Sequence, residues 1–549
     1  MRAAALAASL LALVLAAPLL AQPDITPRAP SDYRQTDAVL THYPALGHVR
    51  LVSPAFDKPE PSLTSQDEMA TFLATLARES RHVRLKSLGR STLGRDIPLL
   101  YVTREGLDDP AAIGRLGRPV IWLIGQQHGN EPAGGEAMLA VAAALSSGEL
   151  EPLLGQLSVV IVPRGNVDGA AADGRDLASG ADPNRDHLLL SQPEVRALHG
   201  AMRALPPDVV VDHHEFSVAW RWVEKFGALQ GPDVTILEAT HPAVPRPLTD
   251  IAHSLYRPAL EAAMARHGLS SHDYVTTNAD RTDRSVSLGG NAPGIARNTF
   301  GLRGSVSYLI ETRGVGIGLQ SYQRRVATHY LLAKAMLEAS AADPASLRNR
   351  IDAARAAAAV GPLELVVSHR LGERPIVLPL IDPKSGAPKP TGVTLADSRK
   401  VEPTELRRRP LGYLVLRGAR PVAERLVLNQ VLVCEVAAPA RLEVEFYRVT
   451  RVKARASRES INPDQSMQVA VSGKTVEVPI GALWVPMEQA AAGIVAAALE
   501  PDSPGSYLGV GVIPMADDET EAPLYRVMST QGLSLTPIDG APTPLCPRR

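Results

Sequence analysis

Residues 120–131 read Val120-Ile121-Trp122-Leu123-Ile124-Gly125-Gln126-Gln127-His128-Gly129-Asn130-Glu131. The first five residues are large and apolar, as in a buried strand, and a helical apolar run over 133–145 follows the polar end of the stretch. On a tight turn at a strand end, the spacing of His128 and Glu131 lets an imidazole and a carboxylate bind one cation, and Gly129 permits a sharp backbone path. Alone, such a pair is more often a surface histidine beside a helix N-terminus.

The alternation of short apolar runs with longer helical ones continues to about residue 341. Strands are predicted over 159–162, 209–211 and 306–310, and a helix over 326–337. This alternation of strand-like and helical runs predicts an α/β domain with a central sheet. Such sheets carry their chemistry on loops just beyond the strand ends, where the polar residues of this chain lie.

The pattern of apolar and polar residues changes after residue 361. A helical segment over 347–359 precedes Gly361-Pro362, and short alternating runs follow it, with one late apolar helix over 490–499. The alternating runs cover 411–416, 431–436 and 442–447. We therefore expect a signal peptide at 1–21, the α/β domain at 22–345, a helical linker at 346–361 and a β-rich, sandwich-like domain at 362–549.

The charges of the chain are balanced. Its 549 residues include 57 Lys and Arg and 58 Asp and Glu, with no long basic run. This composition gives no sign of the basic surface that binds nucleic acid, so a small molecule or a peptide is the expected partner.

The N-terminus has the pattern of a secretory signal, with Arg2, an apolar stretch over 3–20 and small residues before Gln22. We expect an exported protein, periplasmic or secreted, without stable membrane insertion after signal removal; a retained anchor is the alternative.

Only Cys434 and Cys546 are present. They are too few for a disulfide framework or a thiolate zinc site, although they could pair after export.

Two further strand ends carry candidate site residues. His214 follows the apolar run 209–211 and is the candidate third ligand of a two-His-one-Glu zinc site, whereas His213 is interpreted as its ordinary neighbour. Glu311 ends the run 306–310, and a glutamate beside zinc can exchange a proton with water. Read singly, these residues would be surface histidines and an ion-pair partner of a nearby arginine.

The intervening loops contain arginine beside asparagine, a combination that suits a free C-terminal carboxylate. The candidates are Arg164 and Asn166 in the first loop, and Arg175, Asn184 and Arg185 in the second. Each loop alone would be interpreted as a turn with a surface arginine.

The set of motifs resembles the zinc carboxypeptidase family, the metallocarboxypeptidases also called funnelins. The matching motifs, in the family's order, are His128-x-x-Glu131, Asn166-x-Asp168-Gly169, Asp182-x-Asn184-Arg185, Asp212-x-His214 and Glu311. The resemblance covers residues 32–341, and the long β-rich C-terminal part is similar to that of an exported bacterial subgroup. Five ordered motifs are far more specific than one.

The resemblance implies an α/β/α sandwich with a mixed twisted sheet and a zinc-dependent carboxypeptidase activity. One zinc ion would be held by His128, Glu131 and His214, with Glu311 as general base and acid. By the same resemblance Asn184 and Arg185 would bind the terminal carboxylate of a peptide substrate, and Asp182 would orient His128. Arg175 would polarise the scissile carbonyl, with Arg164 as the weaker candidate.

The chain departs from the family at the tyrosine that caps the substrate. Tyr274, Tyr308 and Tyr322 are present without a clear placement, and Arg297 would either favour an acidic substrate residue or be a structural arginine. Two other functions stay open: a cell-wall peptide amidase or N-acyl amino acid deacylase, and a non-catalytic zinc-bearing, peptide-binding protein.

Overall fold

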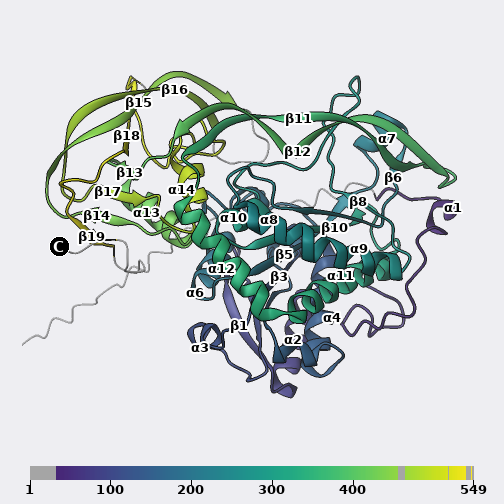
Figure 1. Cartoon of the computed structure of the whole chain (residues 1–549). Coiled ribbons are helices and arrows are strands. Elements are labelled where there is room, and N and C mark those ends of the chain that lie inside the picture. Colours follow the sequence, from purple (N-terminus) through teal and green to yellow (C-terminus); the bar gives the residue numbers. More distant parts are fainter. Residues whose placement is uncertain (1–31, 456–463, 517, 539–545, 547–549) are drawn as a thin grey trace, which may run out of the picture.

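The computed structural model describes residues 32–455, 464–516, 518–538 and 546 (Figure 1). Within these ranges, the amino-terminal part is built on an eight-stranded sheet in the order β1-β2-β4-β3-β5-β10-β7-β8. Its central strands β4, β3, β5 and β10 are mutually parallel, whereas β2 and β7 run antiparallel to β4 and β10, so the sheet is mixed. The strands are β1 (Val83–Arg90), β2 (Asp96–Val102), β3 (Val120–Gly125), β4 (Ser158–Val162), β5 (Val209–Ser217), β7 (Val234–Glu238), β8 (Ser271–Asp273) and β10 (Val306–Val315).

Helices cover both faces of this sheet because its central strands are apolar on both sides. In β3, Ile121 and Leu123 pack in the core with α4, α9 and α11, while Trp122 and Ile124 pack on the opposite face with α6 and α10. The predicted α/β/α sandwich with a mixed sheet is therefore confirmed. The helices are α1 (Asp37–Leu40), α2 (Gln66–Glu79), α3 (Pro110–Arg115), α4 (Pro132–Ser147), α5 (Val167–Ala171), α6 (Pro193–Ala204), α7 (Arg221–Phe226), α8 (Arg246–Ile251), α9 (Arg257–Arg266), α10 (Ala296–Leu302), α11 (Tyr322–Ala342) and α12 (Pro344–Val360).

The predicted signal peptide at 1–21 lies outside the described residues. In the part of the chain that the structure does describe, no helix is both long and apolar enough to cross a membrane.

The carboxy-terminal part contains a second sheet, with seven strands in the described ranges. Helices α13 (Ala419–Leu428) and α14 (Ala492–Leu499) share a hydrophobic core with one face of this sheet. In a sandwich, a second sheet would cover that face; here the two helices cover it. Cys434 and Cys546 form a disulfide across a Cα–Cα distance of 6.1 Å. The strands are β13 (Gly412–Val415), β14 (Cys434–Val436), β15 (Ala440–Arg455), β16 (Asp464–Val478), β17 (Leu483–Pro486), β18 (Glu521–Val527) and β19 (Leu535–Pro537).

A long hairpin joins the two parts of the molecule. Strands β11 (Glu364–Ile381) and β12 (Pro388–Arg408) pair with each other, and they extend from the carboxy-terminal sheet across the amino-terminal part (Figure 1). There β11 pairs with β6 (Leu229–Gln230) and β12 pairs with β9 (Ser285–Ser287). The hairpin thus completes a four-stranded sheet with strands that lie far away in the sequence.

An ion-pair network fixes the hairpin to the sheet edge. The Arg399 guanidinium on β12 lies 2.5 Å from a carboxylate oxygen of Glu238 at the end of β7 and 2.7 Å from one of Asp273 on β8. His253 and Arg257 also bind these two carboxylates. Because the Glu238 side chain is only 2% exposed, its charge depends on these partners.

The network predicts a stability effect for Arg399→Met. Removing the guanidinium leaves the buried Glu238 and the half-buried Asp273 with one cation fewer, so the free energy of unfolding should fall by about 3 kcal/mol. Calorimetry would measure this as a lower Tm. Arg370→Met is the matched control on the same hairpin, because the Arg370 guanidinium is 76% exposed and lies 3.7 Å from Glu402. Its Tm should stay close to that of the parent. Equal losses in both variants would contradict the role of the network.

Candidate metal centre and active site

The site lies where the parallel strands β3, β5 and β10 end at one edge of the sheet. His128 and Glu131 occupy the loop between β3 and α4, His214 lies in β5, and Glu311 lies in β10. The Cα atoms of His214 and Glu311 are partners in the parallel register of β5 and β10. Their side chains therefore project from the same face of adjacent strands.

His128, Glu131 and His214 bring three ligand atoms together in a buried cluster. The Glu131 oxygens lie 2.8 Å from the Nδ1 atoms of His128 and His214, which are themselves 3.0 Å apart. All candidate ligand atoms lie within 4.8 Å of one another. Two imidazole nitrogens and a carboxylate oxygen form a donor set that suits zinc, and the three residues predicted from the sequence fit such an ion.

An aspartate lies behind each of the two imidazoles. His128 Nε2 is 3.1 Å from Asp182 Oδ1, and His214 Nε2 is 2.8 Å from Asp212 Oδ2. A carboxylate can only accept a hydrogen bond, so each Nε2–H can donate to its aspartate, and each Nδ1 would then present its lone pair to a cation bound at the cluster. Asp212 also accepts a hydrogen bond of 2.8 Å from Gln127 Nε2.

The alternation of side chains along β5 separates His214 from His213. Asp212 and His214 project toward the cluster, whereas His213 projects to the opposite face, where its Nδ1 is 3.0 Å from that of His329 on α11. Sequence reasoning gave Asp212 no role, although its position two residues before His214 in a strand places both on one face.

The charges of the cluster shift the pKa values of its members. Burial would raise the pKa of Glu131, but His128 and His214 outweigh it and lower this pKa below the ordinary carboxyl value. Burial lowers the pKa of His214, but Asp212 and Glu131 outweigh this effect. The pKa of His214 therefore rises above its ordinary value. At Glu311, burial and the nearby charge of Glu131 raise the pKa to about 8. The carboxylates that raise the pKa of His214 also favour a metal cation at the same place.

A cavity of about 650 Å³ opens above the cluster and contains most of the predicted site residues. The residues of the cluster and its surroundings that line it are His128, Glu131, Arg175, Asn184, Arg185, Tyr274, Arg297 and Glu311. Arg164 is not among the lining residues; its guanidinium is buried against Gln126, Gln66 and the Thr64 carbonyl. The structure therefore favours Arg175 over Arg164 as the arginine beside the cluster.

Arg175 bridges the cluster and its supporting aspartate. One guanidinium nitrogen lies 2.8 Å from Asp182 Oδ2, and the other lies 3.2 Å from His128 Nδ1 and 3.4 Å from Glu131 Oε1. Burial lowers the pKa of Arg175, but Asp182 and Glu131 outweigh this and raise it above the ordinary value. Arg175 is therefore positively charged, and it lies next to any group that binds at the cluster.

Asn184 and Arg185 also line the cavity, in a short turn that begins after Asp182. The Asn184 backbone N–H donates to Asp182 Oδ1 at 2.8 Å, and its side-chain oxygen accepts from Ala296 N at 2.9 Å. An Arg185 guanidinium nitrogen lies 3.0 Å from the Asn184 carbonyl and 4.0 Å from Asp182. Asp182 therefore supports His128, Arg175 and this turn together.

Of the three tyrosines with unclear placement, Tyr274 alone lines the cavity. Burial and the neighbouring Glu311 raise its pKa. The Tyr308 hydroxyl instead donates to the Ala252 carbonyl at 2.7 Å, and Tyr322 is buried at the start of α11. Tyr274 lies in the loop after β8, where the sequence offers no periodic pattern to place a side chain.

Gly129 is required for a reason different from the expected sharp turn. A Cβ atom at Gly129 would lie 2.0 Å from the carbonyl carbon of Gly169, so the two loops touch through bare backbone. Asn166 and Asp168 hold this contact: Asn166 Oδ1 accepts from Gly169 N at 2.8 Å, and Asp168 accepts from Ser91, Leu93 and Arg95. The Asn166-x-Asp168-Gly169 motif thus supports the loop and does not line the cavity.

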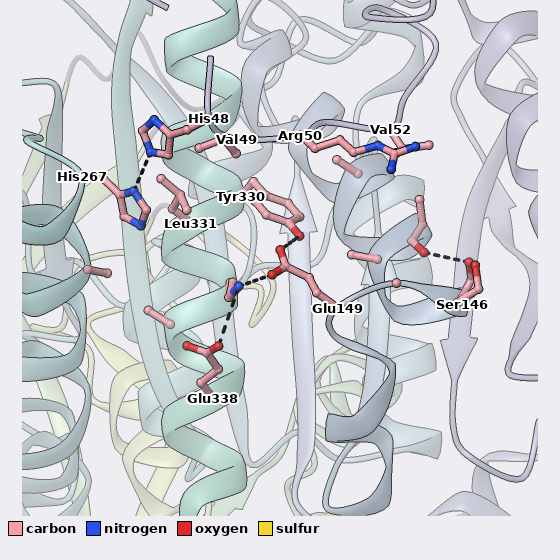
Figure 2. Close-up of a pocket in the computed structure, with 18 of the residues that line it drawn as sticks. His48, Val49, Arg50, Val52, Ser146, Glu149, His267, Tyr330, Leu331 and Glu338 are labelled. Atoms are coloured by element: carbon pink, nitrogen blue, oxygen red, sulfur yellow. Dashed lines mark hydrogen bonds and ion pairs between the residues drawn. The ribbon is translucent and has the colours of Figure 1, made fainter. Parts of the chain in front are cut away.

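A larger cavity of about 950 Å³ lies on the opposite face of the sheet, among α2, α4, α9 and α11 (Figure 2). Its polar side chains contact one another: Glu149 binds Tyr330 and Lys334, and His48 stacks on His267. None of the predicted site residues lines it, so the smaller cavity is the candidate active site.

Comparison with known proteins agrees with this assignment. Residues 69–337 match the model of the zinc carboxypeptidase family. Carboxypeptidase 2 of Trichophyton rubrum is 25% identical over 518 residues, which cover 90% of this chain and 94% of that protein. Carboxypeptidase E of Caenorhabditis elegans is 31% identical over 121 residues, 21% of this chain and 23% of that protein.

Among solved structures, carboxypeptidase A of Helicoverpa armigera gives a TM-score of 0.39 with 18% identity, over 56% of this chain and 79% of that one. A metallo-carboxypeptidase of Pseudomonas aeruginosa gives 0.37 with 21% identity, over 50% and 69%. The α/β/α fold and the buried His–Glu–His cluster describe a metallopeptidase. Residues 69–337 thus form a domain of the zinc carboxypeptidase family.

Zinc binding should respond in a graded way to changes in the cluster. His214→Ala removes one ligand and should abolish stoichiometric zinc, whereas Asp212→Asn removes only the partner of His214 and should weaken zinc affinity about 10- to 100-fold. Zinc content after dialysis against a graded chelator would be measured by mass spectrometry. The exposed His42 is the control, and His42→Ala should retain full zinc. Full zinc in His214→Ala would contradict the ligand assignment.

Proposed function

We propose that the protein is a zinc-dependent carboxypeptidase that hydrolyses the C-terminal peptide bond of substrates with a free carboxylate. The observation that carries this proposal is that a single cavity is lined by His128 and Glu131 of the metal cluster, by Glu311 and by Arg185. A proton-transfer group and an anion-binding group thus flank one candidate metal site. Membership in the family supports the same reaction class.

Zinc held by these three side chains would act as a Lewis acid that polarises a carbonyl and acidifies water. Glu311 is the proposed general base, which takes a proton from the attacking water and later returns it to the leaving amine. Its raised pKa suits a group that must both accept and donate a proton near neutral pH. A bound cation would lower this pKa from about 8, because positive charge favours the carboxylate.

The other cavity residues would bind and orient the peptide. Arg185 and Asn184 are proposed to bind the terminal carboxylate, for which the guanidinium offers a two-pronged donor. Arg175, 3.4 Å from Glu131, would stabilise negative charge that develops on the scissile carbonyl oxygen. Tyr274 is proposed to close over the bound substrate, since it lines the same cavity near Glu311.

We also propose that the protein is exported to the periplasm or secreted. The secretory pattern over residues 1–21 supports this location, and so does the disulfide between Cys434 and Cys546. Disulfides persist in oxidising compartments and are rare in the cytosol.

The reaction is tested by incubating purified protein with a mixed peptide library and identifying the products by mass. Release of single C-terminal residues that stops on chelation would support the proposal. Bound zinc without peptide cleavage would favour a cell-wall peptide amidase or an N-acyl amino acid deacylase. Neither zinc nor hydrolysis would contradict the proposal.

Glu311→Gln should retain zinc and lose turnover by about 10²- to 10⁴-fold, because the amide cannot accept the proton. Glu338→Gln, on the exposed side of α11, should turn over like the parent. In the parent, kcat/KM should fall as the pH falls through the pKa of Glu311, because the base is then protonated. The midpoint should lie between the ordinary 4.5 and about 8. Near-parental turnover in zinc-loaded Glu311→Gln would exclude Glu311 as the base.

Arg185→Met should raise KM for a peptide with a free C-terminus by about 10- to 100-fold, since a charge-assisted contact to the carboxylate is lost. The control uses the same peptide with an amidated C-terminus. The parent enzyme should cleave the amide poorly, and the substitution should change its rate little. An equal effect of Arg185→Met on both peptides would show that Arg185 does not bind the carboxylate.

A further inference from the structure

Arg297 is a buried cation in the wall of the candidate active site. It lies in the first turn of α10, is 2% exposed and lines the same cavity as Glu311 and Tyr274. Gly289 allows this close approach: a Cβ atom there would lie 2.8 Å from Arg297 Nη2 and 3.3 Å from the Tyr274 ring. Arg297, Tyr274 and Gly289 therefore form one wall of the cavity.

Main-chain carbonyls hold the Arg297 side chain in place. Nε donates to the Glu238 carbonyl at 3.2 Å, and Nη2 donates to the Gly290 carbonyl. Within the described residues, no carboxylate lies within 4.0 Å of this guanidinium. The nearby Glu238 carboxylate is already occupied by Arg399 and His253. Neutral acceptors thus fix the orientation of Arg297 without balancing its charge.

A buried arginine without a counter-ion is unfavourable, because burial removes its hydration. This cost lowers the pKa of Arg297 to about 10. Buried arginines are usually paired. Arg303 also has no carboxylate within 4.0 Å among the described residues, but unlike Arg297 it does not line the cavity. An anionic group from outside the chain would provide the missing counter-charge at this wall.

The proposed function leaves Arg297 unused. It assigns Arg185 to the terminal carboxylate and Arg175 to the scissile carbonyl. Of the carboxylates that line the cavity, Glu131 and Glu311 belong to the metal cluster and the proton transfer, and Glu215 pairs with Arg325. Arg297 adds a buried guanidinium to the same cavity, and such a group fits a second carboxylate on the same substrate. The cavity, at about 650 Å³, has room for a C-terminal residue with its side chain.

We propose that Arg297 binds the side-chain carboxylate of a C-terminal glutamate or aspartate and makes the enzyme selective for such peptides. This inference rests on the proposed carboxypeptidase function. Neutral side chains leave the guanidinium uncompensated, and a C-terminal lysine or arginine places two like charges side by side. Discrimination therefore comes both from attraction to acidic residues and from repulsion of basic ones.

The first test compares peptides that differ only in the last residue: Glu, its neutral isostere Gln, and Lys. With the zinc-loaded full chain, kcat/KM should be about 100-fold higher for Glu than for Gln, and lowest for Lys. Equal rates for Glu and Gln, with release of C-terminal residues from both, would overturn the selectivity proposal and leave the carboxypeptidase function standing.

The second test changes the residue itself. Arg297→Met keeps an apolar stem without the charge, and it should lower kcat/KM for the Glu peptide about 100-fold while changing the Gln peptide little. Arg303→Met is the matched control, because Arg303 is also buried at the end of α10 but contacts His199 and does not line the cavity. Its Glu preference should equal that of the parent. A preference that survives in Arg297→Met, with unchanged zinc content and Tm, would overturn the proposal.

A binding measurement separates selectivity from catalysis. Titration calorimetry of zinc-loaded Glu311→Gln with N-acetyl-glutamate and N-acetyl-glutamine should show tighter binding of glutamate, and Arg297→Lys in that background should lose part of the difference. This preference without peptide hydrolysis by the parent would support the Arg297 site and contradict the carboxypeptidase function. Equal binding of both ligands would contradict the Arg297 site, and it would do so even where Arg297→Met fails to fold.

Discussion

The parallel register of β5 and β10 is the constraint on which the site depends. It places the Cα atoms of His214 and Glu311 side by side, so that a metal ligand and the proposed base share one face of the sheet. The opposite face of the same strands carries apolar residues such as Val211 and Ile310, which pack under the helices. A slip of one residue would turn His214 and Glu311 toward this apolar core and would turn Val211 and Ile310 toward the site. The hydrophobic core therefore enforces the geometry of the polar site.

The second constraint is the balance of buried charge. Asp182 and Asp212 each face one imidazole, and Glu131 lies between the two. Such carboxylates would be costly to bury together without cations. Arg175 supplies one positive charge by contacting Asp182, and a divalent ion at the cluster would supply the rest. The charge arrangement that holds the site together is thus the arrangement that favours a metal cation.

The sequence predicted those features that have a local pattern. The strands at 120–124, 209–211 and 306–310 are continuous apolar runs, and the structure confirms them within β3, β5 and β10. The hairpin β11–β12 was not predicted, because few of its residues are fully buried and its partners β6 and β9 are only two and three residues long. Pairings of this kind are non-local and leave no periodicity. The roles of the site residues remain predictions, because motifs give the chemistry of side chains but no test of it.

The carboxy-terminal part of the chain supports the wall of the candidate active site. On β12, the Ser398 hydroxyl donates to the Leu288 carbonyl at 2.6 Å, immediately before Gly289 in the wall. Arg399 holds the carboxylate of Glu238, whose carbonyl accepts from Arg297. The charge of Glu238 acts to raise the pKa of Arg297, but its carboxylate contacts Arg399 and not Arg297. The hairpin therefore fixes the wall and, by engaging Glu238, leaves the charge of Arg297 directed to the cavity.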